Sequence, residues 1–253
     1  MIEFSQFSPL FRAALHANGM QELDTPALVE RFFALTERML QVNAVMNLTT
    51  ITEPRELILR HYIDSLTLLP YIPQGARVLD VGCGAGFPCL PLCIARPDLR
   101  LCALDSTAKK VRYVGDTAAL LGLDGLQAIS GRAEELAAPG QPMRESFDVV
   151  VSRAVARLNV LGELCLPFLR VDGTLIAMKG SKAVEEMEEF TKGVGQLGGQ
   201  NMTLIDCEIV SPAENDAPEG AAPEHHGLVI VKKVRKTKEI YPRKYAQIVK
   251  KPL

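Results

Sequence analysis

The stretch R-V-L-D-V-G-C-G-A-G-F-P, Arg77 to Pro88, decides the fold of this chain. The apolar residues Val78 and Leu79 predict a short strand, which ends at a loop where every second residue is glycine, and the helix-forming stretch 90–95 follows. Glycine has no Cβ, so the backbone can turn sharply and a ligand can lie directly against it. The stretch therefore predicts a strand, a tight ligand-binding turn and the start of a helix.

The spacing of the glycines separates two classes of ligand. A dinucleotide-binding fold uses G-x-G-x-x-G, so that a pyrophosphate meets the helix N-terminus. This chain instead has D-x-G-x-G-x-G, with Asp80 before Gly82, Gly84 and Gly86. That spacing resembles the S-adenosylmethionine (SAM) loop of class I methyltransferases, where a carboxylate near a sulfonium and an ammonium group is useful. A glycine-rich turn without a ligand is the alternative.

Strands and helices alternate along the chain from Arg77 onward. Two further β-rich runs flank the Pro-, Ala- and Glu-rich segment 211–224 and predict a hairpin with a long, mobile tip. This order predicts a class I methyltransferase fold of the α/β class, Rossmann-like, with a mostly parallel sheet that ends in an antiparallel hairpin. The expected strands are 77–81, 99–104, 126–130, 148–151, 174–178, 202–210 and 227–234, and the expected helices are 90–95, 107–121, 159–169 and 181–196.

Residues 1–72 have the apolar spacing of helices. We expect helices over 4–18, 26–42 and 54–70, with Pro26 in the first turn of the second. The chain is therefore divided into an N-terminal helical cap, 1–72, and a methyltransferase domain with a basic C-terminal tail, 73–253.

Composition is that of an ordinary globular protein, with 253 residues, 47% of them hydrophobic and 23% charged. No apolar run approaches the roughly 20 residues that span a bilayer, and the N-terminus lacks a basic region followed by an apolar one. The six cysteines form no C-x-x-C pair and have no histidine at metal-ligand spacing. We expect a monomer in the cytoplasm, with reduced thiols, no metal and no membrane contact.

The distribution of charge says more than the net charge of −2. Between residues 232 and 251 Glu239 is the only acid, whereas lysine and arginine recur throughout. Such a segment predicts an arm that contacts phosphates. A solvated, frayed chain end is the alternative.

Polar residues follow the second and third expected strands. Asp105 ends the second strand, about 20 residues past the glycine loop, where an acid accepts hydrogen bonds from ribose hydroxyls. A dehydrogenase would place an acid there too, so Asp105 predicts an adenosine ligand without naming it. After the third strand, the backbone of Ala133 and Glu134 would lie beside an adenine. Alternatively, Glu134 is a first-turn acid of a short helix.

The fourth strand runs into Arg153, but no catalytic base follows it. The chain lacks the N-P-P-Y-like motif of exocyclic-amine methyltransferases, and Cys165-Leu166-Pro167 has the wrong order for a cytosine C5 nucleophile. A ring nitrogen with a free lone pair, such as guanine N7, needs placement rather than a base. Arg153 could offer two donors to an O6/N7 edge, to a phosphate or to the methionine carboxylate. A structural salt bridge is its alternative role.

Several motifs in collinear order resemble the GidB/RsmG family. They include N-A-V-M-N-L-T (43–49), R-H-Y-I-D-S-L (60–66), L-D-V-G-C-G-A-G-F-P (79–88), L-D-S-T-A-K-K-V (104–111), G-R-A-E-E-L (131–136), V-S-R-A-V-A-R-L (151–158), M-K-G (178–180) and Y-P-R-K (241–244). The resemblance implies methylation, with SAM, of N7 of a guanine in 16S ribosomal RNA of the small subunit.

The resemblance also implies roles for single residues. Phe87 would join the glycine loop, Asp105, the Ala133–Glu134 backbone and Arg153 in binding the cofactor, and Arg153 would also serve catalysis. A further set would border the cleft or the RNA path: Asn47, Arg60, His61, Asp64, Ser65, Lys179 and Arg243.

The chain departs from the family pattern in a few places. Cys83 stands where threonine is common, Cys89 where glycine is usual, and Val42 where an aromatic residue is usual. His225 and His226 occupy the region of a family arginine, and the segment 211–224 is longer than usual. Two other functions remain open: methylation of a small molecule by the same fold, and a non-catalytic SAM-binding module associated with the ribosome.

Overall fold

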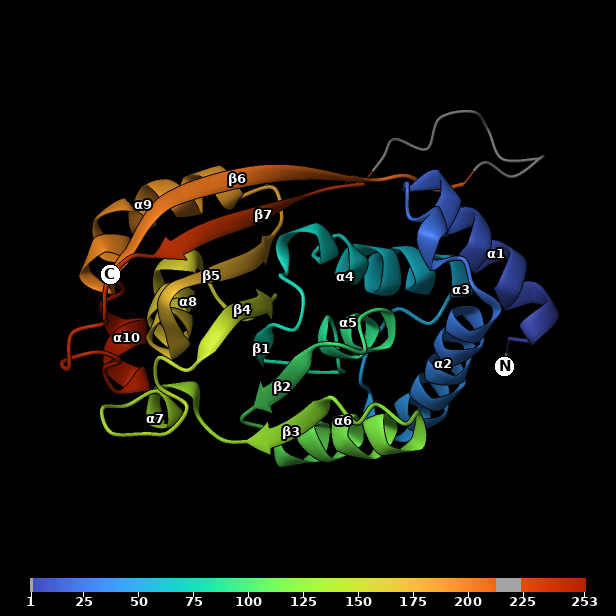
Figure 1. The fold of residues 1–253 in the computed structure, drawn as a ribbon, viewed down its shortest axis with the longest axis horizontal. Coiled ribbons are helices and arrows are strands. Elements are labelled where there is room, and N and C mark those ends of the chain that lie inside the picture. Colours follow the sequence, from blue (N-terminus) through green and yellow to red (C-terminus); the bar gives the residue numbers. More distant parts are fainter. Residues whose placement is uncertain (1, 213–223) are drawn as a thin grey trace.

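A computed structural model describes residues 2–212 and 224–253 and contains one seven-stranded sheet (Figure 1). Its strand order is β3-β2-β1-β4-β5-β7-β6; β1 to β5 run parallel, and β7 is antiparallel to both β5 and β6. This confirms the expected parallel sheet with a C-terminal antiparallel hairpin. The strands are β1 Arg77–Val81, β2 Arg100–Asp105, β3 Leu126–Ser130, β4 Phe147–Arg153, β5 Leu169–Lys179, β6 Gly199–Ile209 and β7 Glu224–Lys233.

Helices cover both faces of the sheet (Figure 1). Helices α5 (Cys89–Ala95) and α6 (Ala108–Leu120) pack on one face, and α8 (Leu158–Cys165) and α9 (Ala183–Gln196) on the other. Because successive strand residues point to opposite faces, Val78 joins the core on the first side and Leu79 the core on the second. The strands β1, β2 and β4 are therefore buried on both sides, as their apolar runs require, whereas β3 and β6 at the two edges of the sheet are partly exposed.

The N-terminal helices α1 (Phe4–Ala17) and α2 (Pro26–Met46) pack through aromatic rings, with the Phe11 and Phe32 centroids 4.7 Å apart. The expected third helix is divided into α3 (Pro54–Leu57), a π-helical segment (Ile58–Ile63) and α4 (Asp64–Leu66). All of these share one apolar core with the α5 side of the sheet. The domain boundary at residue 72 stays a prediction. No helix of the described chain is long and apolar enough to cross a membrane.

Some elements differ from the expected ones. The helix expected over 159–169 begins at Leu158 and ends at Cys165, because Pro167 cannot donate the backbone hydrogen bond that an α-helix needs; a 3₁₀ turn, Leu166–Phe168, leads into β5 instead. Helix α7 (Ala133–Leu136) confirms the alternative in which Glu134 is a first-turn acid of a short helix, whereas α10 (Tyr245–Lys250) was not expected. Most of the expected mobile hairpin tip, residues 213–223, lies outside the described residues.

Two cations of the basic terminus hold the fold together. Lys233 is fully buried, and its Nζ donates to the Leu166 carbonyl at 2.7 Å and to the Thr237 hydroxyl; burial lowers its pKa to about 8. Arg243 forms a fork with the fully buried Glu163 of α8, with Nη2 2.6 Å from Oε2. Exposed cations of this segment that could contact phosphates include Lys236, Lys238, Lys244, Lys250 and Lys251.

We expect Arg243→Met to lower the free energy of unfolding by about 3 kcal/mol, because Glu163 would remain buried without its cation. Urea unfolding of both proteins measures the difference. Lys251→Met removes an exposed charge from the same segment and should change stability by less than about 0.5 kcal/mol. An Arg243→Met protein as stable as the wild type would contradict this structural role.

Candidate functional site

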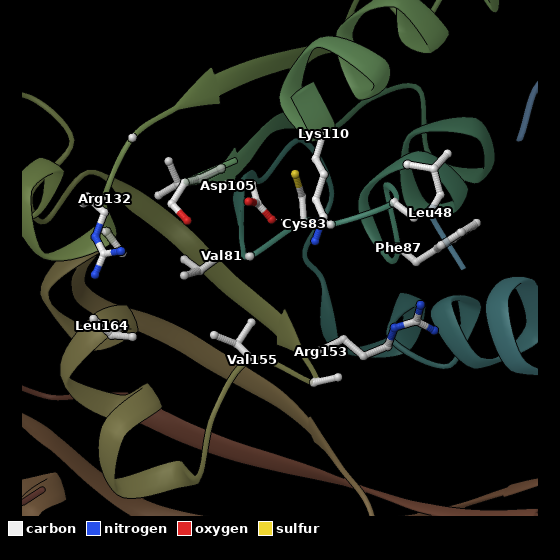
Figure 2. Close-up of a pocket in the computed structure, with 18 of the residues that line it drawn as sticks. Leu48, Val81, Cys83, Phe87, Asp105, Lys110, Arg132, Arg153, Val155 and Leu164 are labelled. Atoms are coloured by element: carbon white, nitrogen blue, oxygen red, sulfur yellow. Dashed lines mark hydrogen bonds between the residues drawn. The ribbon is translucent and has the colours of Figure 1, made fainter. Parts of the chain in front are cut away.

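A cavity of about 420 Å³ lies where β1, β2 and β4 end (Figure 2). Parallel strands carry ligand sites at their carboxyl ends, and this volume is in the range of small-molecule sites. Its walls come from the loop after β1, the ends of β2 and β4, and the loop before α7. We call it the first cavity. Of the residues expected to bind a cofactor, it brings together Gly82, Gly84, Phe87, Asp105, Ala133, Glu134 and Arg153.

The glycines of the loop have different tasks. Gly82, Gly84 and Gly86 have φ values of +78°, +54° and +89°, which side chains rarely adopt. A Cβ on Gly82 would lie 2.3 Å from Cγ2 of Val155, so the loop could not pack there. A Cβ on Gly84 would meet only the Gly82 carbonyl oxygen, at 3.8 Å, and Gly84 therefore presents bare backbone to the cavity. Gly86 packs against α5 and does not line the cavity.

Asp105 is fixed against the glycine loop. Its Oδ2 accepts a hydrogen bond from the Gly84 N–H at 3.0 Å, and its Oδ1 accepts one from the Thr107 N–H at 2.7 Å. Each carboxylate oxygen can accept more than one hydrogen bond, so both can still receive ligand hydroxyls. Figure 2 shows this carboxylate in the middle of the cavity, between Cys83 and Val81.

Asp80 lies outside the first cavity, although its spacing suggested a ligand contact. It is fully buried beneath the loop, where Oδ2 accepts from the Cys89 N–H at 3.2 Å; Oδ1 has no partner among the described residues. Burial raises the pKa of Asp80 to about 7, against the effects of Cys89 and Arg153. Asp80 therefore connects the loop to the start of α5 instead of facing the cavity.

Arg153 is held at the cavity wall by several partners. Its Nη1 donates to Oδ2 of Asp64 and to the Arg60 carbonyl, both at 2.9 Å, and Nη2 lies 3.3 Å from Nδ1 of His61. Its guanidinium also lies 5.4 Å from the centre of the Phe87 ring. Arg153 thus makes the salt bridge that was its alternative role, and it lines the cavity as well.

His61 comes from the π-helical segment and stacks on Phe87, with the ring centres 4.4 Å apart. Burial and the neighbouring Arg153 lower its pKa to about 4. The imidazole is therefore neutral at pH 7 and a weak proton acceptor. Its Nδ1 lies 3.3 Å both from the Arg153 N–H group, which can only donate, and from the Arg60 carbonyl, which can only accept, and Nε2 lies 3.0 Å from Oγ1 of Thr49.

The far end of the first cavity holds Arg132, from the motif G-R-A-E-E-L, and two residues to which the sequence assigned no role, Leu164 and Tyr245. Arg132 pairs with Glu134 at 2.9 Å, and its guanidinium lies 4.4 Å from the centre of the Tyr245 ring. Tyr245 belongs to the unexpected helix α10, and Leu164 of α8 lies on the same wall. Both residues reach the cavity only through the packing of distant segments, which no local motif reveals.

A second cavity, also of about 420 Å³, shares Arg153, Ala154 and Val155 with the first. It gathers Asp64 and Lys179 together with Glu186 and His226, two residues that were not expected there. Lys179 Nζ lies 2.8 Å from Oε2 of Glu186, and Nδ1 of His226 lies 3.1 Å from Oδ1 of Asp64.

The other expected RNA contacts lie outside both cavities. Asn47 ends α2 with a left-handed φ of 50° and is exposed, and Arg60 is also exposed. Ser65 is buried and donates to the His61 carbonyl at 2.5 Å. Arg243 pairs with Glu163, as described above. Within the described chain, no group of His, Cys, Asp and Glu could hold a metal ion.

Solved structures with the same fold include methyltransferases. The chain matches a SAM-dependent O-methyltransferase from Thermotoga maritima with a TM-score of 0.52 at 15% identity, covering 81% of this chain and 73% of that one. It matches an O-methyltransferase from Bacillus cereus, solved in complex with SAH, with a TM-score of 0.54 at 15% identity, covering 89% and 100%. The fold is that of the class I methyltransferases.

The chain belongs to the GidB family, described as rRNA small subunit methyltransferase G, whose family model matches residues 29–211. The protein named ribosomal RNA small subunit methyltransferase G from Lactobacillus helveticus is 40% identical over 228 residues, which is 88% of this chain and 90% of that protein. The protein of the same name from Limosilactobacillus fermentum is 40% identical over 247 residues, covering 96% and 97%.

Proposed function

We propose that this protein transfers a methyl group from SAM to N7 of a guanine in the 16S ribosomal RNA of the small subunit. One observation carries the proposal. Every described residue that lines the first cavity, except Tyr245, lies within the span 29–211 that matches the family. The segment that defines the family is thus the segment that builds the cavity.

The residues of the first cavity fit SAM. The bare backbone at Gly84 leaves room for a ligand to approach closely, and the buried Asp105 offers two fixed acceptors for ribose hydroxyls. The Ala133–Glu134 backbone would face the adenine, and Arg153 could pair with the methionine carboxylate. Bound there, SAM supplies an electrophilic methyl group.

The charges around the cavity favour an acceptor that needs no deprotonation. His61 is the imidazole at the wall, and its lowered pKa makes it a poor base at neutral pH. Guanine N7 attacks with a lone pair that is already free, so the task of the protein is to place the base in line. Arg153 and the Phe87–His61 stack fix one wall for that placement.

The C-terminal segment supports an RNA substrate. Tyr245 lines the first cavity, and exposed lysines of the same segment, such as Lys244 and Lys238, could hold phosphates near it. Action as a monomer in the cytoplasm stays a prediction.

Transfer of label from methyl-labelled SAM tests the substrate class. We expect label in the RNA fraction of small-subunit particles from cells that lack this methylation, with a rate that falls steeply as salt rises from 50 to about 200 mM. Label in a small-molecule extract, with little salt dependence, would support the small-molecule alternative. SAM binding without any transfer would support the non-catalytic one.

A further inference from the structure

We propose that the second cavity receives the guanine to be methylated, and that Glu186 selects this base by accepting hydrogen bonds from its N1–H and N2–H groups. The inference rests on the proposed function, since it gives a place to the acceptor of that reaction. It assigns a role to a residue that no sequence motif singled out.

The position of the second cavity suits an acceptor. Arg153 at the end of β4 pairs with Met178 of β5, the residue before Lys179, so the two cavities lie side by side at the strand ends. Figure 2 places Arg153 and Phe87 at one end of the first cavity and Arg132 at the other. A flat base in the second cavity would therefore lie next to the end of the first cavity that Arg153 lines. It would lie away from the Ala133–Glu134 backbone, where we propose that the adenine of SAM binds.

The backbone between the cavities is strained. Ala154 has a φ of +55°, in the left-handed region that residues other than glycine rarely adopt. Such strain persists only where the surrounding structure fixes it, and it concentrates at functional sites. Here it lets Arg153 line both cavities while Val155 packs over Gly82.

Glu186 is a fixed acceptor with one oxygen still available. It lies in the first turn of α9, its Oε2 accepts a hydrogen bond from the Leu158 N–H at 2.8 Å, and the same oxygen forms an ion pair with Lys179 Nζ, also at 2.8 Å. Among the described residues, no group donates to Oε1. Lys179 also donates to the Ala156 carbonyl at 2.5 Å, which leaves its third N–H for a ligand.

This pattern is complementary to guanine. Guanine has two neighbouring N–H donors on its Watson–Crick edge, at N1 and N2, with the acceptors O6 and N7 beyond them. A carboxylate that takes the donor edge leaves O6 directed toward the cations Lys179 and Arg153, while N7 keeps its lone pair free for the methyl group. Adenine would instead turn the unprotonated N1 toward Oε1 of Glu186, so that two acceptors would face each other without a donor between them, and this mismatch disfavours adenine.

The test compares guanosine with inosine, which lacks the N2 amino group but keeps N7. Small-subunit particles are assembled from RNA that carries either nucleoside at the methylated position, and transfer from labelled SAM is measured as kcat/KM. We expect the wild-type protein to prefer guanosine by about tenfold or more. In Glu186→Gln this preference should fall to within about threefold, while SAM affinity is unchanged.

Glu188→Gln is the matched control, because Glu188 is an exposed acid on the same helix. It should keep the wild-type preference. If Glu186→Gln does not fold, Glu186→Asp is used in its place. The comparison of guanosine with inosine in the wild-type protein needs no variant and tests the inference in either case.

Equal transfer to both nucleosides by the wild-type protein would overturn the inference, as would a full preference in a folded Glu186 variant. A merely structural role of Glu186 would lower both rates together and leave the preference intact. Failure of the proposed function is distinct, because the wild-type protein would then methylate neither particle.

Discussion

An Asp105→Ala protein is expected to bind SAM about 100-fold more weakly than the wild type. The substitution removes both carboxylate oxygens proposed to accept the ribose hydroxyls, and each hydrogen bond to a charged group contributes about 1.5–3 kcal/mol. It also releases the Gly84 N–H, which the carboxylate holds at 3.0 Å. Equilibrium dialysis with labelled SAM measures the dissociation constant.

The control for Asp105 is Asp116→Ala, which removes an exposed acid from α6. It should bind SAM like the wild type. A folded Asp105→Ala protein with a dissociation constant within threefold of the wild type would place the ribose elsewhere.

Loss of Arg153 should act mainly on methyl transfer. We expect Arg153→Ala to lower kcat/KM for particles by at least about 100-fold, because the side chain orders the wall between the two cavities and a misplaced reacting group costs about that factor. Arg153→Lys should recover only part of the rate, since it keeps the charge but not the planar fork that bonds Asp64 and His61 together.

The readouts separate catalysis from structure. Arg31→Ala removes an exposed arginine from α2 and should leave transfer unchanged. If Arg153 serves only as the salt-bridge partner of Asp64, the rate of methyl transfer by Arg153→Ala should fall only as far as the fraction of folded protein falls. Near-normal transfer by a stable Arg153→Ala protein would remove Arg153 from the site.

The elements that depend on neighbouring residues in the chain were predicted correctly from the sequence. The glycine loop follows from positive φ values that only glycine adopts easily, and the strand pattern follows from burial on both faces. Asp105 was predicted as a site residue because it is an acid at the end of the second strand, about 20 residues past the glycine loop, and the structure places it in the first cavity. These signals lie within about 30 residues of one another.

Residues whose environment depends on distant segments were harder to predict. Lys233 and Arg243 were predicted to belong to an arm that contacts phosphates. Instead, Lys233 bonds Leu166 and Arg243 bonds Glu163, 67 and 80 residues away in sequence. Asp80 shares the strand face of Val78, toward α5, so its proximity to the loop in sequence did not bring it into the cavity. Glu186 of α9 lies beside the second cavity through its ion pair with Lys179 at the end of β5, a contact that no local motif reveals.

Identification of the modified nucleoside tests the central claim most directly. The protein is incubated with labelled SAM and unmethylated small-subunit particles, and the RNA is digested to nucleosides and separated. The account predicts that the label co-migrates with 7-methylguanosine. Label in any other nucleoside, or none in a protein that still binds SAM, would contradict it.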